Sequence, residues 1–77
     1  MIPPPPGVWP GLDGNGVGCR EKIKMLTENY QEAAQVLQDA FEDASLMGVD
    51  EDGMREILTG IVMGLMSPKR GGPEGNP

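Results

Sequence analysis

Residues 23–47 read IKMLTENYQEAAQVLQDAFEDASLM, and this stretch decides the fold. Its apolar residues recur at alternating spacings of three and four, the heptad pattern of a helix that packs against other helices. We call these residues the apolar stripe: Ile23, Leu26, Tyr30, Ala33, Leu37, Ala40, Ala44 and Met47. Polar residues occupy the opposite face, so the pattern and the helix propensities agree. The sequence therefore predicts one long amphipathic helix over about residues 20–47.

Two features of this helix bear on its partners. Val36 and Phe41 flank the apolar stripe, and a stripe of that width suits a bundle better than a strict two-stranded coiled coil. The end charges oppose the helix dipole, with Arg20, Lys22 and Lys24 at the start and Asp39, Glu42 and Asp43 near the end. Antiparallel pairing of two copies would turn this cost into attraction. A solvated surface, on which exposed charges contribute little, is the alternative.

A second helix is predicted over about residues 51–66. Gly48 can adopt the left-handed conformation that ends the first helix, and Asp50 is a suitable N-cap for the second. Pro68 disfavours helix at the residue before it, which sets the end. The apolar positions cover most of the circumference: Met54, Ile57, Leu58, Ile61, Val62, Leu65 and Met66. Such a helix must be covered on several sides.

The predicted fold class is all-α, an antiparallel helical hairpin, because a connection of two to four residues makes the helices neighbours. The hairpin domain spans residues 19–67. It follows an extended Pro/Gly-rich arm, residues 1–18, and precedes a flexible tail, residues 68–77. Pro3 to Pro6 form a short polyproline II rod. Trp9 is a candidate anchor, and the arm is expected either to be disordered or to lie across a partner.

Composition excludes several classes of function. Twelve Asp and Glu against six Lys and Arg give a net charge of −6, which argues against nucleic acid as a partner. One cysteine and no histidine allow neither an internal disulfide nor a recognisable metal motif. The longest apolar run, residues 57–66, is about half of the roughly 20 residues that span a membrane. Without a secretory signal, the chain is expected in the cytoplasm or within a soluble particle, not secreted.

Six carboxylates gather around the predicted turn, namely Asp39, Glu42, Asp43, Asp50, Glu51 and Asp52. We call them the acidic cluster. They could meet a basic partner, but Gly48 and Thr59 stand where a calcium loop needs acidic ligands, so calcium is not expected. Cys19 beside Arg20 could have a lowered thiol pKa, yet the chain has no histidine to act as its base. We expect no catalytic residues, no metal and no cofactor, and therefore no enzyme.

Two helices of unequal length cannot cover both the apolar stripe and the second helix, which favours an intermolecular surface. Gly60 and Gly64 form a G-x-x-x-G pair, which allows close helix approach or is merely tolerated. The predicted interface residues are Ile23, Leu26, Tyr30, Ala33, Leu37, Ala40, Phe41, Met47, Ile57, Gly60, Ile61, Gly64 and Leu65.

Two hypotheses of function follow. The first is a non-enzymatic structural or assembly protein that forms a homo-oligomer or docks into a larger multi-subunit particle, for example as a minor virion component. This analogy rests on architecture alone. The second is a small acidic adaptor or inhibitor that binds a basic site on a partner protein through the acidic cluster.

Overall fold

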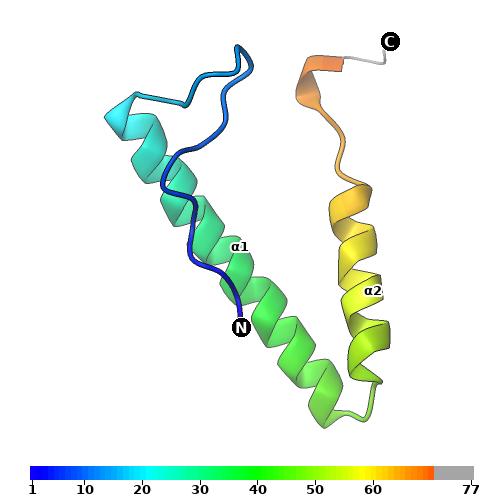
Figure 1. Ribbon diagram of the computed structural model, residues 1–77. Helices are drawn as coiled ribbons and strands as arrows, with labels where there is room; N and C mark the ends of the chain where they lie inside the picture. The colour runs from blue at the N-terminus through cyan, green and yellow to red at the C-terminus, as the bar shows by residue number, and fades with distance from the viewer. Residues whose placement is uncertain (71–77) are drawn as a thin grey trace. The chain divides into compact units, whose positions relative to one another are not determined.

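The computed structural model describes residues 1–70 of the 77-residue chain, and the final part of the predicted tail, residues 71–77, lies outside the described residues. Two α-helices dominate the fold, α1 (Arg20–Leu46) and α2 (Glu51–Met63), and a short 3₁₀ helix, η1 (Pro68–Arg70), follows them (Figure 1). An isolated antiparallel bridge between Pro10 and Gly16 is the only strand-like pairing in the described part. The predicted all-α, hairpin-like fold is confirmed. The described residues form two compact units, and the first ends at Glu42 while the second begins at Asp43.

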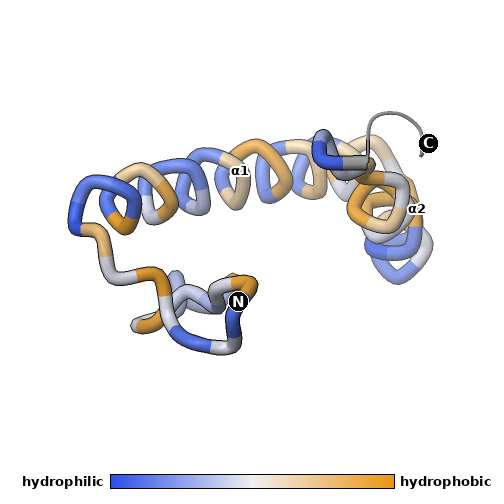
Figure 2. Tube along the Cα trace, turned by 90° about the horizontal axis from the view of Figure 1, so that it is seen from above, coloured by the Kyte–Doolittle hydropathy of each residue, from blue (hydrophilic) through white to orange (hydrophobic). Residues whose placement is uncertain are grey.

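Helix α1 has the predicted bounds to within one residue. Its first intrahelical bond runs from the Ile23 N–H to the Cys19 carbonyl at 2.9 Å. On the polar face, Gln35 and Gln38 each donate a 2.8 Å hydrogen bond to the carboxylate four residues later, on Asp39 and Glu42. Such i,i+4 pairs stabilise an exposed helix face. Figure 2 shows apolar and polar segments alternating along α1, as an amphipathic helix requires.

The connection between the helices is a Schellman motif, in which a left-handed glycine ends α1. Gly48 has a φ of 94°, its N–H bonds to the Ser45 carbonyl at 3.1 Å, and the Val49 N–H bonds to the Ala44 carbonyl at 2.9 Å. These bonds satisfy carbonyls that the helix end leaves unpaired. Ala44 is also the only buried residue of the described chain, with 8% of its surface exposed. The turn is thus the best packed part of the second unit.

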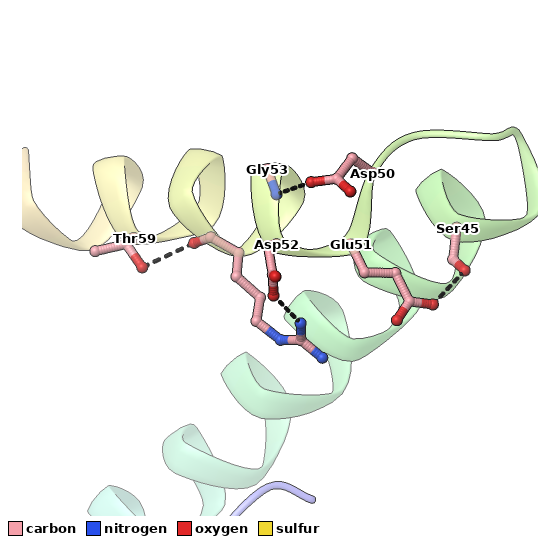
Figure 3. Close-up of polar contacts among 7 residues, drawn as sticks. Ser45, Asp50, Glu51, Asp52, Gly53 and Thr59 are labelled. Carbon is pink, nitrogen blue, oxygen red and sulfur yellow. Dashed lines mark hydrogen bonds and ion pairs between the residues drawn. The ribbon is translucent and has the colours of Figure 1, made fainter.

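Helix α2 begins as predicted, at a capping aspartate. The Gly53 N–H donates to Asp50 Oδ2 at 2.8 Å (Figure 3). The Ser45 hydroxyl donates to Glu51 Oε2 at 2.8 Å, so a side chain of the last turn of α1 is hydrogen-bonded to the first turn of α2. Glu51 and Asp52 place negative charge at the positive end of the helix dipole. Local polar contacts therefore set this helix start.

Replacing the cap with Asp50→Ala is expected to lower the free energy of unfolding by about 1 kcal/mol, since the Gly53 N–H loses its acceptor. The measurement is urea unfolding followed by far-ultraviolet circular dichroism. Glu56→Ala removes an exposed acid from the same helix outside the cap and serves as the control. Equal midpoints for the two variants would show that the cap is dispensable.

The end of α2 differs from the prediction. The helix stops at Met63 with Gly64 as its C-cap, so Leu65 and Met66 lie beyond it. The last turn tightens, because the Gly64 N–H bonds to the Gly60 and Ile61 carbonyls and the Leu65 N–H reaches only three residues back. Glycine costs about 1 kcal/mol relative to alanine within a helix. With Pro68 close behind, this cost ends the helix a turn early.

The arm has more internal structure than its composition predicts. The Val17 N–H bonds to the Trp9 carbonyl at 2.8 Å, and the Gly11 N–H bonds to the Asn15 carbonyl at 2.7 Å. Gly14 takes a φ of 85° at the tip of this loop. The Asn15 backbone N–H donates to Asp13 at 3.0 Å and lowers the pKa of that carboxyl group. Residues 9–17 thus form a closed loop, because the glycines that make the arm flexible also permit its turn.

Candidate functional site

The first unit contains a contact between the arm and α1 that is centred on Tyr30. The rings of Trp9 and Tyr30 meet edge to face, with centroids 6.3 Å apart and planes at 73°. The Tyr30 hydroxyl donates a hydrogen bond to the Pro3 carbonyl. In Figure 1 the arm, in blue, runs beside the first half of α1. One residue of the apolar stripe is therefore already in contact with the chain's own arm.

This contact is incomplete in one respect. The Trp9 indole nitrogen is buried, and it has no hydrogen-bond partner among the described residues. A buried donor without an acceptor costs about 1–3 kcal/mol, which offsets part of the gain from the ring contact. The unsatisfied indole N–H therefore weakens the contact between the arm and α1.

No predicted interface residue is fully buried in the described chain. The half-buried ones are Ile23, Leu26, Tyr30, Leu37, Ala40 and Phe41, together with Trp9 of the arm. The exposed ones are Ala33, Met47, Ile57, Gly60, Ile61, Gly64 and Leu65. Within residues 1–70, α1 therefore has a partly covered stripe, and the apolar residues of α2 remain largely accessible.

Helix α2 has no buried residue, although six of its 13 residues have large apolar side chains. Ile57, Ile61 and Val62 are 59%, 57% and 52% exposed, and Met63 is 78% exposed. Full burial of one such side chain stabilises by about 1.5–3 kcal/mol relative to exposure. A surface that removed several of them from water would thus gain several kcal/mol toward the cost of association.

Gly60 of α2 and its C-cap, Gly64, do not mark a close helix contact within the described residues. A Cβ built on Gly60 meets no heavy atom within 4 Å, and one on Gly64 meets only backbone carbonyl oxygens of its own helix. Gly64 acts instead as the C-cap. Close approach at Gly60, which the G-x-x-x-G spacing suggests, would need a partner beyond the described residues.

Most of the acidic cluster is used in local hydrogen bonds. Five of its six carboxylates accept from a donor nearby in the sequence, in the pairs Gln35–Asp39, Gln38–Glu42, Gly53–Asp50, Ser45–Glu51 and Arg55–Asp52. Asp43 is exposed. Across residues 1–70, no three Asp, Glu or Cys side chains come together as a metal ion would require. The described structure thus offers exposed carboxylates but no ligand cage.

Cys19 is exposed at the start of α1. The backbone N–H groups of Lys22 and Glu21 hydrogen-bond to its sulfur and lower the thiol pKa from its ordinary value of 9.0, and the positive charge of Lys22 adds to this effect. The chain contains no histidine that could act as a general base. The start of α1 therefore favours the thiolate form of Cys19.

Alkylation of Cys19 by iodoacetamide is expected to rise with pH about a midpoint below 9.0 in the folded protein, because the helix start favours the thiolate. By the same linkage, this thiolate stabilises the fold above the unfolded pKa, and the contribution disappears as the pH falls through the folded pKa. Lys22→Gln should raise the thiol pKa only slightly, because the backbone amide groups lower it more than the charge of Lys22 does. An identical midpoint in concentrated urea would contradict the shift.

The contact between Trp9 and Tyr30 is the feature that sequence reasoning missed. The sequence predicts Trp9 as an anchor for another protein, whereas its ring contacts Tyr30 of the same chain. The available signal was weak. The chain has one Trp, one Tyr and one Phe, so any aromatic pair must combine two of these three residues.

Comparisons add no assignment to this geometry. In the described part of the chain, neither helix has the length and apolar character needed to cross a membrane. No protein-family model matches the chain. No curated protein and no solved structure matches it either.

Proposed function

We propose that this chain is a non-enzymatic assembly protein that associates through its apolar helical faces, with other copies of itself or with the subunits of a larger particle. The observation that carries the proposal is α2, a 13-residue helix rich in apolar side chains and without one buried residue. The apolar stripe of α1 supports it, since only Ala44 of that stripe is buried. Exposed apolar faces of this kind are typical of interaction surfaces.

Sedimentation equilibrium of the purified chain at low and high salt tests this proposal. Association is expected to persist or strengthen at high salt, because apolar burial survives screening and each chain carries a net charge of −6 that repels its copies. A monomer at every concentration and salt, with a cooperative thermal transition, would refute self-association.

Gly60→Leu provides a variant that separates a partner contact from a defect of the chain itself. An added side chain at Gly60 meets open space in the described structure, so the helical content should stay equal or rise. Association should weaken if a partner approaches closely there, and Glu56→Leu on the same helix is the matched control. If Gly60→Leu associates as well as the unaltered chain does, Gly60 is not part of the interface.

A second candidate, the acidic adaptor, draws on the net charge of −6 and the exposed carboxylates. It predicts binding to a basic protein that falls steeply with salt. A triple variant, Asp39→Asn with Glu42→Gln and Asp43→Asn, should abolish that binding while the helical content stays unchanged. Affinity equal to that of the unaltered chain would exclude this function.

A further inference from the structure

The apolar stripe of α1 has a size pattern that complements itself in one antiparallel register. In this register the twofold axis of the pair passes between residues 31 and 32 of each α1. Ile23 of one copy then lies opposite Ala40 of the other, and Leu26 lies opposite Leu37. In the central layers Tyr30 lies opposite Ala33. Each layer therefore combines a large residue with a small one, or two leucines, as close packing of facing helices requires. These layers end before Ala44, which the turn already buries.

Charge selects the same register. Lys22 and Asp43 each directly precede a residue of the stripe, so they lie on one flank of it. Flanking residues of this kind face each other across an antiparallel pair. In the register above, Lys22 faces Asp43 of the second copy, and the twofold axis repeats the pair. Among the described residues neither side chain has an ion-pair partner, and both are exposed.

The neighbouring registers lose this complementarity. A shift of one heptad in one direction places Asp43 opposite Asn29, and a shift in the other places Lys22 opposite Val36. A parallel pair places Lys22 near Thr27. Because only the register above places Lys22 opposite Asp43, electrostatics favours it over its neighbours even if each exposed pair adds little affinity.

The arm occupies the centre of this surface. Tyr30 lies in a central layer of the antiparallel register. Its ring contacts Trp9, and its hydroxyl donates a hydrogen bond to the Pro3 carbonyl. A second helix and the arm cannot both cover that ring. The buried and unpaired indole N–H of Trp9 favours release of the arm, because release returns that donor to water.

We propose that residues 23–40 of α1 form an antiparallel seam with a second copy of this chain, with Lys22 facing Asp43 of that copy, and that the arm competes for the seam at Tyr30. This inference rests on the proposed function and names the partner and the register. Dimer formation then requires two chains with displaced arms, so the arm lowers the apparent affinity in proportion to the square of the fraction of chains that are open.

Charge reversal in the full-length chain tests the register. Lys22→Glu and Asp43→Lys should each weaken the dimer by roughly 2- to 30-fold in sedimentation equilibrium at low salt, the range expected when two exposed ion pairs are lost. The double variant should recover the affinity, because opposite charges then face each other again with their signs exchanged. Both single changes improve the match to the helix dipole, so a weaker dimer cannot be attributed to a less stable α1. Unchanged or tighter association of either single variant would overturn the seam.

Competition by the arm has its own readout. Trp9→Ala should tighten the dimer several-fold, whereas Val8→Ala, a change at an exposed arm residue, should leave the affinity unchanged. In the unaltered chain, the fluorescence of its single tryptophan should shift to longer wavelength as dimers form, since Trp9 leaves Tyr30. A weaker or equal dimer for Trp9→Ala would overturn the competition.

The outcomes separate this inference from the proposed function. Association of the unaltered chain that ignores both charge reversals would refute the seam and leave the assembly function in place. A chain that remains monomeric under all conditions would refute self-association and the seam together.

Discussion

Leu37→Asp is expected to leave the protein monomeric at concentrations at which the unaltered chain associates. Leu37 is half-buried on the apolar stripe and lies beside its central layers. An aspartate there forfeits the burial of a leucine and places a carboxylate without a partner in an apolar contact. Because both copies of the dimer carry the change, the loss of association free energy should exceed about 3 kcal/mol. This corresponds to roughly a 100-fold rise in the dissociation constant.

The matched control is Met25→Asp, which introduces the same residue at an exposed position of α1 outside the apolar stripe. Both variants should keep their helical content, as measured by circular dichroism, and only Leu37→Asp should change the molecular weight at sedimentation equilibrium. If Leu37→Asp and Met25→Asp associate equally well, the stripe of α1 is not the contact surface. The apolar face of α2 would then be the remaining candidate.

Gly48→Ala is expected to lower the free energy of unfolding by about 1–2 kcal/mol, because Gly48 adopts a φ of 94° and an L residue with a Cβ is strained there. A Cβ at this position meets no atom within 4 Å, so the cost lies in the backbone and not in packing. In a chain of 77 residues, a single hydrophobic core rarely supplies more than about 3–5 kcal/mol. The substitution therefore removes a considerable share of it.

Gly48→Asn is the control for this backbone effect, since asparagine tolerates the left-handed region better than alanine does. Urea unfolding followed by circular dichroism should rank glycine above asparagine and asparagine above alanine. If alanine matches glycine, the turn must rearrange so that residue 48 leaves the left-handed conformation.

Only part of the candidate interaction surface could be predicted from local sequence. The periodicity of residues 23–47 predicts the stripe, and the structure leaves all of it but Ala44 at least partly accessible. The contact of Tyr30 with the arm could not be predicted, because Trp9 and Tyr30 are far apart in sequence and no local pattern connects them. The outward use of these faces stays a prediction.

The amino-acid sequence by itself determined the start and end of α1, the left-handed glycine of the turn and the capped start of α2. Each of these depends on residues within one or two helical turns, where hydrogen bonding and backbone sterics act locally. The predicted end of α2 was wrong because the cost of Gly64 outweighed the apolar pattern that continues through Leu65 and Met66. Only the tertiary structure decided the place of the arm. Its position depends on a ring contact and a hydrogen bond between residues far apart in sequence, and such contacts are favourable only once α1 has formed to hold Tyr30 in place.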